Sequence, residues 1–188
     1  MTAVDTLNIQ IENINDVPVL EEIGDRETDE DIPLVITLSV DDADGDILTF
    51  TVESDNESVA VSLVDDQLTM SPALNFNGAV AITITVTDTE GAMDSETFIL
   101  TVNAVNDVPI LTLIGDQVTD EDTDFTIDLS ALDVDIDENG QTLTFSAVSS
   151  DESLVLVSTT TDEGDGTAGT LTFDVLAEQN GEAQVTVT

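Results

Sequence analysis

The sequence predicts an all-β fold made of tandem seven-stranded antiparallel Greek-key β-sandwiches. Three observations lead to this prediction. Apolar and polar side chains alternate with a period of two, which is typical of strands with one buried face. Turns rich in Asp, Asn and Gly separate these runs without any helical period, and a block of sequence recurs 91 residues later. Short, regularly spaced strands of this kind are typical of a β-sandwich.

The expected strands of the first copy follow the alternating runs. The clearest run places Val80, Ile82 and Ile84 on one face, with Ala81 and Thr83 on the other. Because successive side chains of a strand point to opposite faces, the first set faces a core and the second faces water. The same pattern predicts seven strands, near residues 18–23, 33–40, 47–54, 58–64, 67–71, 79–88 and 95–104.

The internal repeat is clearest in a linker motif. Asn15-Asp16-Val17-Pro18 recurs as Asn106-Asp107-Val108-Pro109. The same offset relates Thr28-Asp29-Glu30-Asp31 to Thr119-Asp120-Glu121-Asp122, and Asp42-Ala43-Asp44 to Asp133-Val134-Asp135. The second copy carries two insertions, near Asp137 to Gln141 and near Thr160 to Gly169. Self-similarity of this kind indicates tandem copies of one structural unit.

The repeat divides the chain into three segments. Residues 15–105 form a complete repeat, and residues 106–188 form a second repeat that lacks its last strand. Residues 1–14 are expected to be the last strand of a preceding repeat or of a neighbouring chain's repeat, because residues 5–14 align with 96–105. Two explanations stay open: the array is covalent and continues beyond the chain, or copies of the chain exchange strands.

The composition excludes several classes of function. The chain has 42 Asp and Glu residues, a single basic side chain at Arg26, no His and no Cys. Without imidazole or thiol there is no Ser-His or Cys-His nucleophile and none of the usual ligands of zinc. A formal net charge of −41 repels nucleic acid, and no stretch approaches the ~20 apolar residues of a membrane span. We therefore expect no enzyme, no nucleic-acid partner and no membrane insertion in this segment.

Acidic clusters at the expected strand ends recur in both copies, and they indicate a metal site. Two carboxylates ~4 Å apart repel by about 4 kcal/mol at an effective dielectric of 20, so a crowded cluster needs a cation. Calcium accepts 6 to 8 oxygen ligands in loose geometry, whereas magnesium requires a strict octahedron. All-oxygen clusters therefore favour Ca²⁺ as the cofactor.

An EF-hand loop is excluded by its spacing. If Asp42 occupies the first position, Asp44 and Asp46 fall on the third and fifth. The sixth position needs a Gly for its sharp turn and holds Ile47 instead, and no flanking helices are expected.

The linkers resemble those of a known family. Asn13-Ile14-Asn15-Asp16-Val17-Pro18 and Ala104-Val105-Asn106-Asp107-Val108-Pro109 are similar to an Asp-x-Asn-Asp linker followed by Pro. Together with the Thr-Asp-Glu-Asp motif, the Asp-x-Asp motif and Val86-Thr87-Asp88, they resemble the tandem cadherin-like or Ig-like β-sandwich repeats of large bacterial surface adhesins.

The resemblance implies calcium at the junctions between successive domains, with ligands from both domains and the linker. The junction between the two repeats would use Glu30, Asn106, Asp107, Asp133 and Asp135. The junction before the first repeat would use Asn13, Asn15, Asp16, Asp42, Asp44 and Asp88. Asn13 and Ala104 stand where the family has Asp, so we expect one or two ions per junction.

The resemblance also implies a function and a location. The chain is expected to be part of an extracellular, calcium-rigidified spacer, on a cell surface or in a secreted matrix, that holds a distal binding region away from the cell. Its partners would be adjacent repeats or identical chains, and nothing in the sequence specifies the adhesion target. The alternative is a subunit of an extracellular filament, assembled head to tail by donor-strand exchange of residues 1–14 into the C-terminal domain of the next chain.

Overall fold

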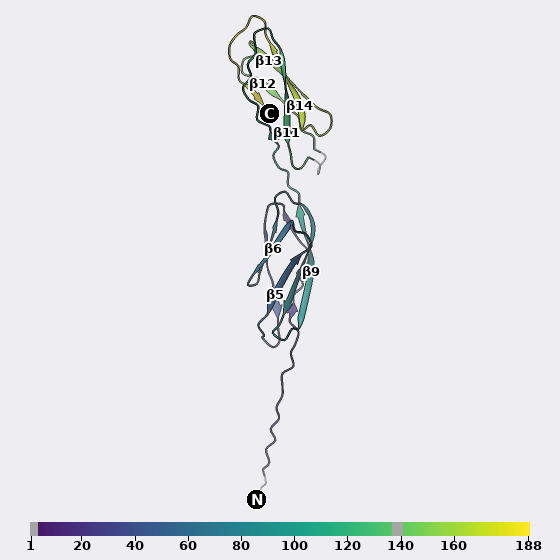
Figure 1. Cartoon of the computed structure of the whole chain (residues 1–188). Coiled ribbons are helices and arrows are strands. Elements are labelled where there is room, and N and C mark those ends of the chain that lie inside the picture. The colour runs from purple at the N-terminus through teal and green to yellow at the C-terminus, as the bar shows by residue number, and fades with distance from the viewer. Residues whose placement is uncertain (1–3, 137–140) are drawn as a thin grey trace. The chain divides into compact units, whose positions relative to one another are not determined.

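The computed structural model describes residues 4–136 and 141–188, which fall into two compact units, residues 1–105 and 106–188. Strands and loops account for both units, and no described residue is helical, so none of the described ranges holds a helix that could span a membrane. The predicted all-β fold is confirmed (Figure 1). Residues 1–3 of the N-terminal segment and 137–140 of the first insertion lie outside the described residues.

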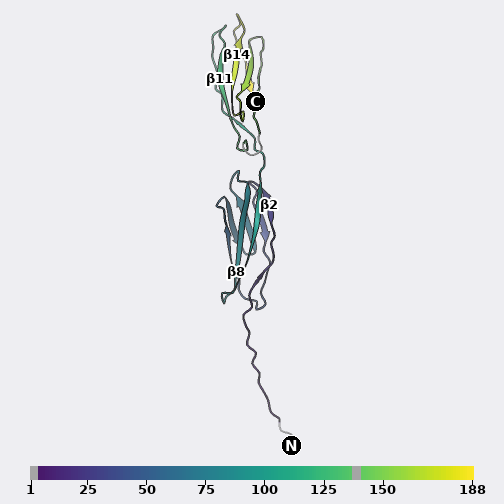
Figure 2. The ribbon, with the colours of Figure 1, turned by 90° about the vertical axis from the view of Figure 1, so that its right-hand side faces the viewer.

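Unit 1 is a β-sandwich with two main sheets. One sheet has the strand order β2-β9-β8-β5 and the other β3-β7-β6, and β1 pairs with β4 beside them. Strands β2 and β8 of the first sheet are labelled in Figure 2. The strands are β1 (Val19–Leu20), β2 (Arg26–Asp29), β3 (Leu34–Thr37), β4 (Val40–Asp41), β5 (Thr49–Ser54), β6 (Val59–Val64), β7 (Gln67–Pro72), β8 (Gly78–Thr87) and β9 (Met93–Asn103).

The core of unit 1 lies between these two sheets. Along β8 every second side chain is buried, and Ile82 and Ile84 have no exposed area. They belong to one apolar cluster with Leu68 and Met70 of β7, which are also fully buried. The period of two in the sequence thus reports the burial of one face of each sheet.

Two strands of unit 1 differ from the prediction. Strand β2 was not expected, because its sequence Arg-Glu-Thr-Asp has no apolar alternation; it lies parallel to β9, with Arg26 opposite Leu100. The expected strand 33–40 is interrupted, because β3 pairs with β7 whereas β4 pairs with β1. Between them, the backbone N–H of Leu38 donates to the carbonyl of Asp66 at 2.7 Å.

Unit 2 repeats part of this arrangement. One sheet has the order β10-β11-β14-β13, and β12 pairs with β15 alone. The rings of Phe125 and Phe173 stack across β11 and β14, with their centroids 4.3 Å apart. The strands are β10 (Ile110–Leu111), β11 (Phe125–Leu132), β12 (Ala147–Ser149), β13 (Val155–Thr161), β14 (Ala168–Val175) and β15 (Val185–Val187). Among the described residues of this unit, no strand corresponds to β2 or β9.

Candidate metal centre

A tight turn after β4 positions the first acidic residues of unit 1. One carboxylate oxygen of Asp42, Oδ1, accepts hydrogen bonds from the backbone N–H groups of Asp44 at 2.9 Å and Asp46 at 3.3 Å. Gly45 adopts a φ of 72°, a left-handed conformation that Gly allows without steric cost. Its N–H donates to the carbonyl of Asp42. This turn therefore brings the carboxylates of Asp42 and Asp46 close together.

Asp88 reaches the same place from the end of β8. Its side chain is 6% exposed, and its Oδ1 accepts from the N–H groups of Glu90 at 2.9 Å and Ala92 at 2.8 Å. These bonds fix the carboxylate over the turn between β8 and β9. The other oxygen, Oδ2, is left facing the linker.

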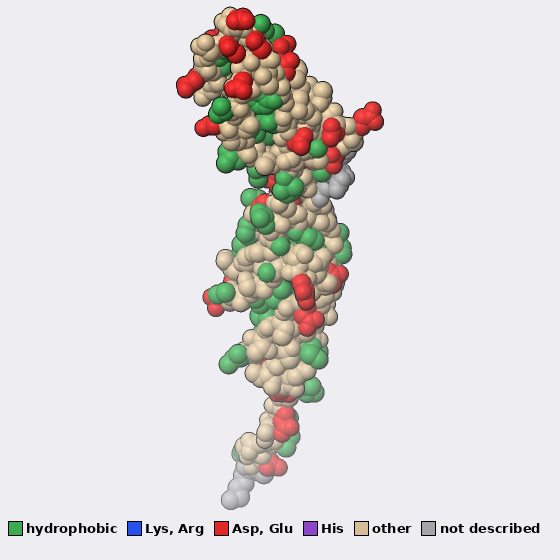
Figure 3. Space-filling view, turned by 45° about the horizontal axis from the view of Figure 1, so that its top comes forward, with side chains coloured by type: hydrophobic (Ala, Val, Ile, Leu, Met, Phe, Trp, Pro, Cys, Tyr) green, Lys and Arg blue, Asp and Glu red, His purple; other side chains and the backbone are tan. Residues whose placement is uncertain are grey.

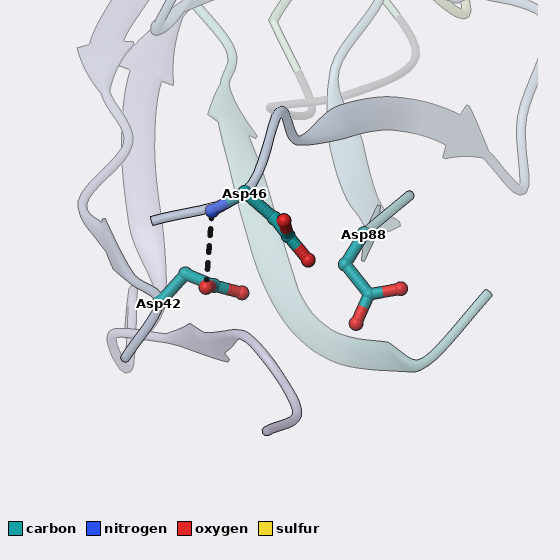
Figure 4. A group of neighbouring side chains, drawn as sticks. All are labelled: Asp42, Asp46 and Asp88. Carbon is teal, nitrogen blue, oxygen red and sulfur yellow. Dashed lines mark hydrogen bonds between the residues drawn. The ribbon is translucent and has the colours of Figure 1, made fainter. Parts of the chain in front are cut away.

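Three carboxylates converge in unit 1. Asp42, Asp46 and Asp88 each present one oxygen, and these atoms lie within 4.8 Å of one another (Figure 4). Oδ2 of Asp42 is buried without a hydrogen-bond partner among the described residues. No Lys lies anywhere in the chain to neutralise the group, and the only Arg is Arg26 of β2. An all-oxygen, anionic cluster with an unsatisfied buried oxygen fits calcium.

The linker before β1 is tied to this cluster. The side-chain amide of Asn13 donates to Asp44 Oδ1 at 2.5 Å, and that of Asn15 donates to Asp88 Oδ2 at 2.8 Å. The backbone N–H of Asp16 donates to Asp44 Oδ2 at 2.6 Å. The hydrogen bond from Asn13, followed by that from Asp16, lowers the pKa of Asp44, and the Asn15 bond lowers the pKa of Asp88. The linker thus favours the ionised form of both carboxylates.

Unit 2 builds the equivalent turn from its own linker and strand end. Asp133 and Asp135 are 5% and 2% exposed, and the N–H of Asp135 donates to Asp133 Oδ1 at 3.1 Å. The N–H of Asp107 donates to Asp135 Oδ2, and Asn106 accepts a bond from the Gln141 amide. Oδ2 of Asp133 is buried without a partner in the described part of the chain, as Oδ2 of Asp42 is.

Glu30 stands apart from the Asp42 cluster. It follows β2, and its N–H donates to the carbonyl of Asn103 at the C-terminal end of β9. Asp88 lies at the N-terminal end of that eleven-residue strand. The side chain of Glu30 is 4% exposed, Oε1 accepts from the N–H of Val105, and Oε2 is a third buried oxygen that lacks a partner among the described residues.

The structure therefore brings together most of the residues predicted for the first junction and adds one. Asp46 belongs to the group of three carboxylates, although the sequence argument had weighed it only as part of an EF-hand. The regular Asp-x-Asp-x-Asp spacing was the signal that pointed to it. Asp44 holds the linker through both of its oxygens and is not in that group. Asp137, which occupies the position of Asp46 in the second copy, lies outside the described residues.

Comparisons with known proteins identify the fold class. Residues 15–101 match the family model described as bacterial Ig domain. Among solved structures, the EC1-4 segment of Drosophila N-cadherin is similar, with a TM-score of 0.52 and 15% identity over 92% of this chain and 48% of that chain. Protocadherin gamma B7 extracellular cadherin domains 1-4 give a TM-score of 0.46 and 14% identity over 92% of this chain and 48% of that one. The chain thus spans about half the length of these ectodomain structures.

The family model and the N-cadherin structure confirm the predicted resemblance. The first repeat is similar to a bacterial Ig domain, and the chain has the Ig-like, cadherin-like β-sandwich fold. A search of curated protein sequences gives no match.

Proposed function

We propose that the chain is a calcium-rigidified spacer in an extracellular protein of a bacterial surface, and that it has no catalytic role. The observation that supports this proposal is the set of buried carboxylate oxygens without partners. Asp42 and Asp133 occupy equivalent positions in the two repeats, and the Oδ2 of each has no hydrogen-bond partner among the residues that the structure describes. A buried, unpaired carboxylate oxygen is costly to fold, so its recurrence in both copies favours a bound cation.

Calcium would act on the linker as well as on the acidic ends. In unit 1 the carboxylates already hold Asn13, Asn15 and Asp16 through hydrogen bonds. The amide oxygens of the two Asn residues and the carboxylate of Asp16 are further hard ligands of the kind that calcium prefers. A cation bound by these groups would hold the linker residues in place. The linker would then be rigid and not flexible, which is what a spacer requires.

The surface supports a passive role better than a binding role. Acidic side chains are scattered over the face shown in Figure 3, with apolar side chains between them. The chain contains no Trp or Tyr, the residues that most often anchor binding hot spots. We assign the recognition of a target to other parts of the protein and the mechanical role to this chain.

The test is a calcium titration of the full chain by calorimetry and thermal denaturation. Binding to the folded state alone contributes about 2.7 kcal/mol at 100 times the dissociation constant, which raises the melting temperature of a domain of this size by at least about 10 °C. Magnesium at the same concentration is expected to give a smaller rise. Small-angle scattering is expected to show a narrower range of molecular dimensions with calcium than with chelator.

A matched pair of variants separates site binding from general charge screening. D42N removes a carboxylate from the cluster, whereas D55N removes one that accepts a hydrogen bond from Ala81 outside the cluster. Both change the net charge by one. The calcium response is expected to fall in D42N and to persist in D55N. Equal responses in the two variants, or no response in the native chain, would refute the proposal.

A further inference from the structure

The side-chain amides of two linker residues lie against the acidic cluster of unit 1. Asn15 donates to Oδ2 of Asp88 at 2.8 Å, and Asn13 donates to Oδ1 of Asp44 at 2.5 Å. Asp88 is one of the three carboxylates that converge there, and its Oδ1 already accepts two backbone N–H groups. The Asn15 amide therefore covers the one oxygen of Asp88 that the turn leaves open.

The orientation of these amides follows from the charge around them. An Asn side chain has a donor end, the NH2 group, and an acceptor end, the carbonyl oxygen. Asp42, Asp46 and Asp88 each present one oxygen within 4.8 Å of the others, and the chain has no Lys to balance them. Carboxylates would repel an amide oxygen, whereas their negative charge strengthens a hydrogen bond from an N–H group. Both Asn side chains consequently present the end that cannot bind a cation.

The linker before β1 is also fixed at points beside these amides. The backbone N–H of Asp16 donates to Oδ2 of Asp44 at 2.6 Å, so both oxygens of Asp44 hold the linker. Pro18 is fully buried, and the N–H of Leu20 donates to Oδ2 of Asp94 at 2.8 Å. The linker is therefore attached to unit 1 along its length with protein groups alone.

We propose that Asn13 and Asn15 are an internal substitute for the cation. Without calcium their amides hold the linker on Asp44 and Asp88, and calcium has to displace them when it binds. The docked linker of the calcium-free chain stands on its own contacts, whereas the displacement step rests on the proposed function. On binding, the two side chains would turn so that their carbonyl oxygens face the ion, because calcium accepts oxygen ligands.

The substitute is incomplete, which leaves a reason for calcium to bind. Oδ2 of Asp42 is buried, and no group in the described ranges donates to it. The same oxygen of Asp133, a residue that is 5% exposed, also lacks a donor among the described residues. An amide has no net charge, so it satisfies a hydrogen bond without neutralising the carboxylates. Calcium would therefore strengthen a restraint that already exists on the linker.

Asn is the residue type that this role needs. An Asp in place of Asn13 would put a carboxylate beside that of Asp44, and two adjacent carboxylates repel each other. A linker with Asp there would need a cation in order to dock. Asn allows docking in both conditions, because it offers N–H groups to the carboxylates and an oxygen to an ion. Ala104 takes the position of Asn13 in the second copy and has no side-chain donor, so this contact is specific to the first linker.

The test measures the order of the linker in the full chain with chelator present, by backbone NMR relaxation and amide hydrogen exchange. In the native chain, residues 13–16 are expected to be nearly as rigid as β8. Ile9 and Ile11 are 76% and 90% exposed and supply the reference for a mobile segment. Exchange of the Asp16 N–H, corrected for its intrinsic rate, is expected to be ~10-fold or more slower than that of Ile11. Residues 13–16 as mobile as this reference would overturn the proposal.

Three variants, each with one Asn changed to Asp, separate the amide contacts from the effect of added charge. N13D and N15D replace a donor by a carboxylate beside the cluster. N8D adds the same charge at an exposed residue that has no hydrogen bond to another described residue. In chelator, residues 13–16 are expected to become mobile in N13D and N15D and to stay ordered in N8D, while exchange in β8 and β9 shows that the sandwich is intact. Equal order of the linker in all three variants would contradict the role of the amides.

A calcium titration of the same chains by calorimetry and NMR tests the displacement step. N15D is expected to bind calcium about 10-fold more tightly than the native chain, because a carboxylate ligand replaces a donor that the ion must displace. N8D is expected to bind as the native chain does, and calcium is expected to restore the order of residues 13–16 in N13D and N15D. Equal affinities of N15D and N8D would overturn the displacement step. If no chain binds calcium although the native linker is ordered in chelator, the amide contacts stand, and the displacement step and the proposed function both fail.

Discussion

At the scale of single residues, the buried carboxylates combine two tasks. In Asp42, Asp133 and Glu30, one oxygen accepts a backbone N–H and the other has no partner in the described structure. The first oxygen shapes a turn or fixes the chain after β9, which is a structural role. The second oxygen carries charge that no described group compensates, so it could accept a cation without losing a hydrogen bond.

Glu30 allows the two tasks to be separated. In E30Q the amide oxygen retains the bond to the Val105 N–H, while the buried negative charge is removed. Without calcium we expect E30Q to be at least as stable as the native chain, and E30A to lose about 1 to 3 kcal/mol because the Val105 N–H loses its partner. Urea denaturation with chelator measures both. Calcium is expected to stabilise E30Q less than the native chain. If calcium raises the free energy of unfolding equally in both, Glu30 is not a calcium ligand.

Asp151 gives a prediction on pH. The Ser153 hydroxyl, followed by the Ser153 backbone N–H, donates to its carboxylate at 2.6 Å and 3.0 Å, and these bonds lower its pKa. A pKa that is lower in the folded state stabilises the protein above the unfolded value, and this contribution is lost as the pH falls through the folded value. Carboxyl NMR should show Asp151 titrating below about 3.9, the usual value for Asp. The D151N variant should lose this part of the destabilisation at acid pH. Titration of the Asp151 carboxyl at or above the usual value for Asp would contradict the prediction.

At the scale of elements, the close approach of neighbouring strands and loops limits which residues the second unit tolerates. A Cβ atom at Gly169, in β14, would lie 2.3 Å from the carbonyl oxygen of Thr160 and 2.8 Å from the ring of Phe145. At Gly166, which has a φ of 79°, it would lie 2.1 Å from the carbonyl oxygen of Leu143. A side chain at either position would therefore clash with a neighbouring segment, so both positions require Gly.

G169A is expected to destabilise unit 2 by about 1 to 3 kcal/mol or more, because an added methyl group overfills a packed site. The matched control is G115A, where no atom lies within 4 Å of the added Cβ and the backbone φ is not in the left-handed region. The control should be neutral or slightly stabilising. Thermal denaturation measures both variants, and equal melting temperatures would show that β14 shifts to accommodate the methyl group.

The elements also show what the sequence can and cannot predict. The apolar alternation of β8 and β9 is strong because both strands have one face on the core, and their prediction is accurate within a few residues. Strand β2 was missed because it gains its place from backbone pairing with β9 and not from a buried face. Asp46 was omitted from the site because it lies outside the Asp-x-Asp motif that carried the resemblance; its place beside Asp42 and Asp88 is visible only in the folded turn.

At the scale of the whole molecule, the two units differ in the size of their cores. Among the described residues, thirteen apolar side chains are buried in the cluster of unit 1 and five in that of unit 2, so unit 2 has less hydrophobic stabilisation. We expect two thermal transitions in dilute solution, with unit 2 unfolding first. Hydrogen exchange should accordingly be slowest in β8 and β9 and faster in β12 and β15. A single transition, with equal protection in both units, would show that the units unfold as one.

The composition of the chain has a consequence for its resistance to proteolysis. Proteases of the trypsin type cut after Lys or Arg, and this sequence offers them one bond, between Arg26 and Glu27. That bond lies in β2, where the backbone is paired with β9, and cleavage would first require this edge of the sheet to open. The same scarcity of basic side chains that leaves the carboxylates without ion-pair partners therefore leaves trypsin-type proteases with a single, protected point of attack.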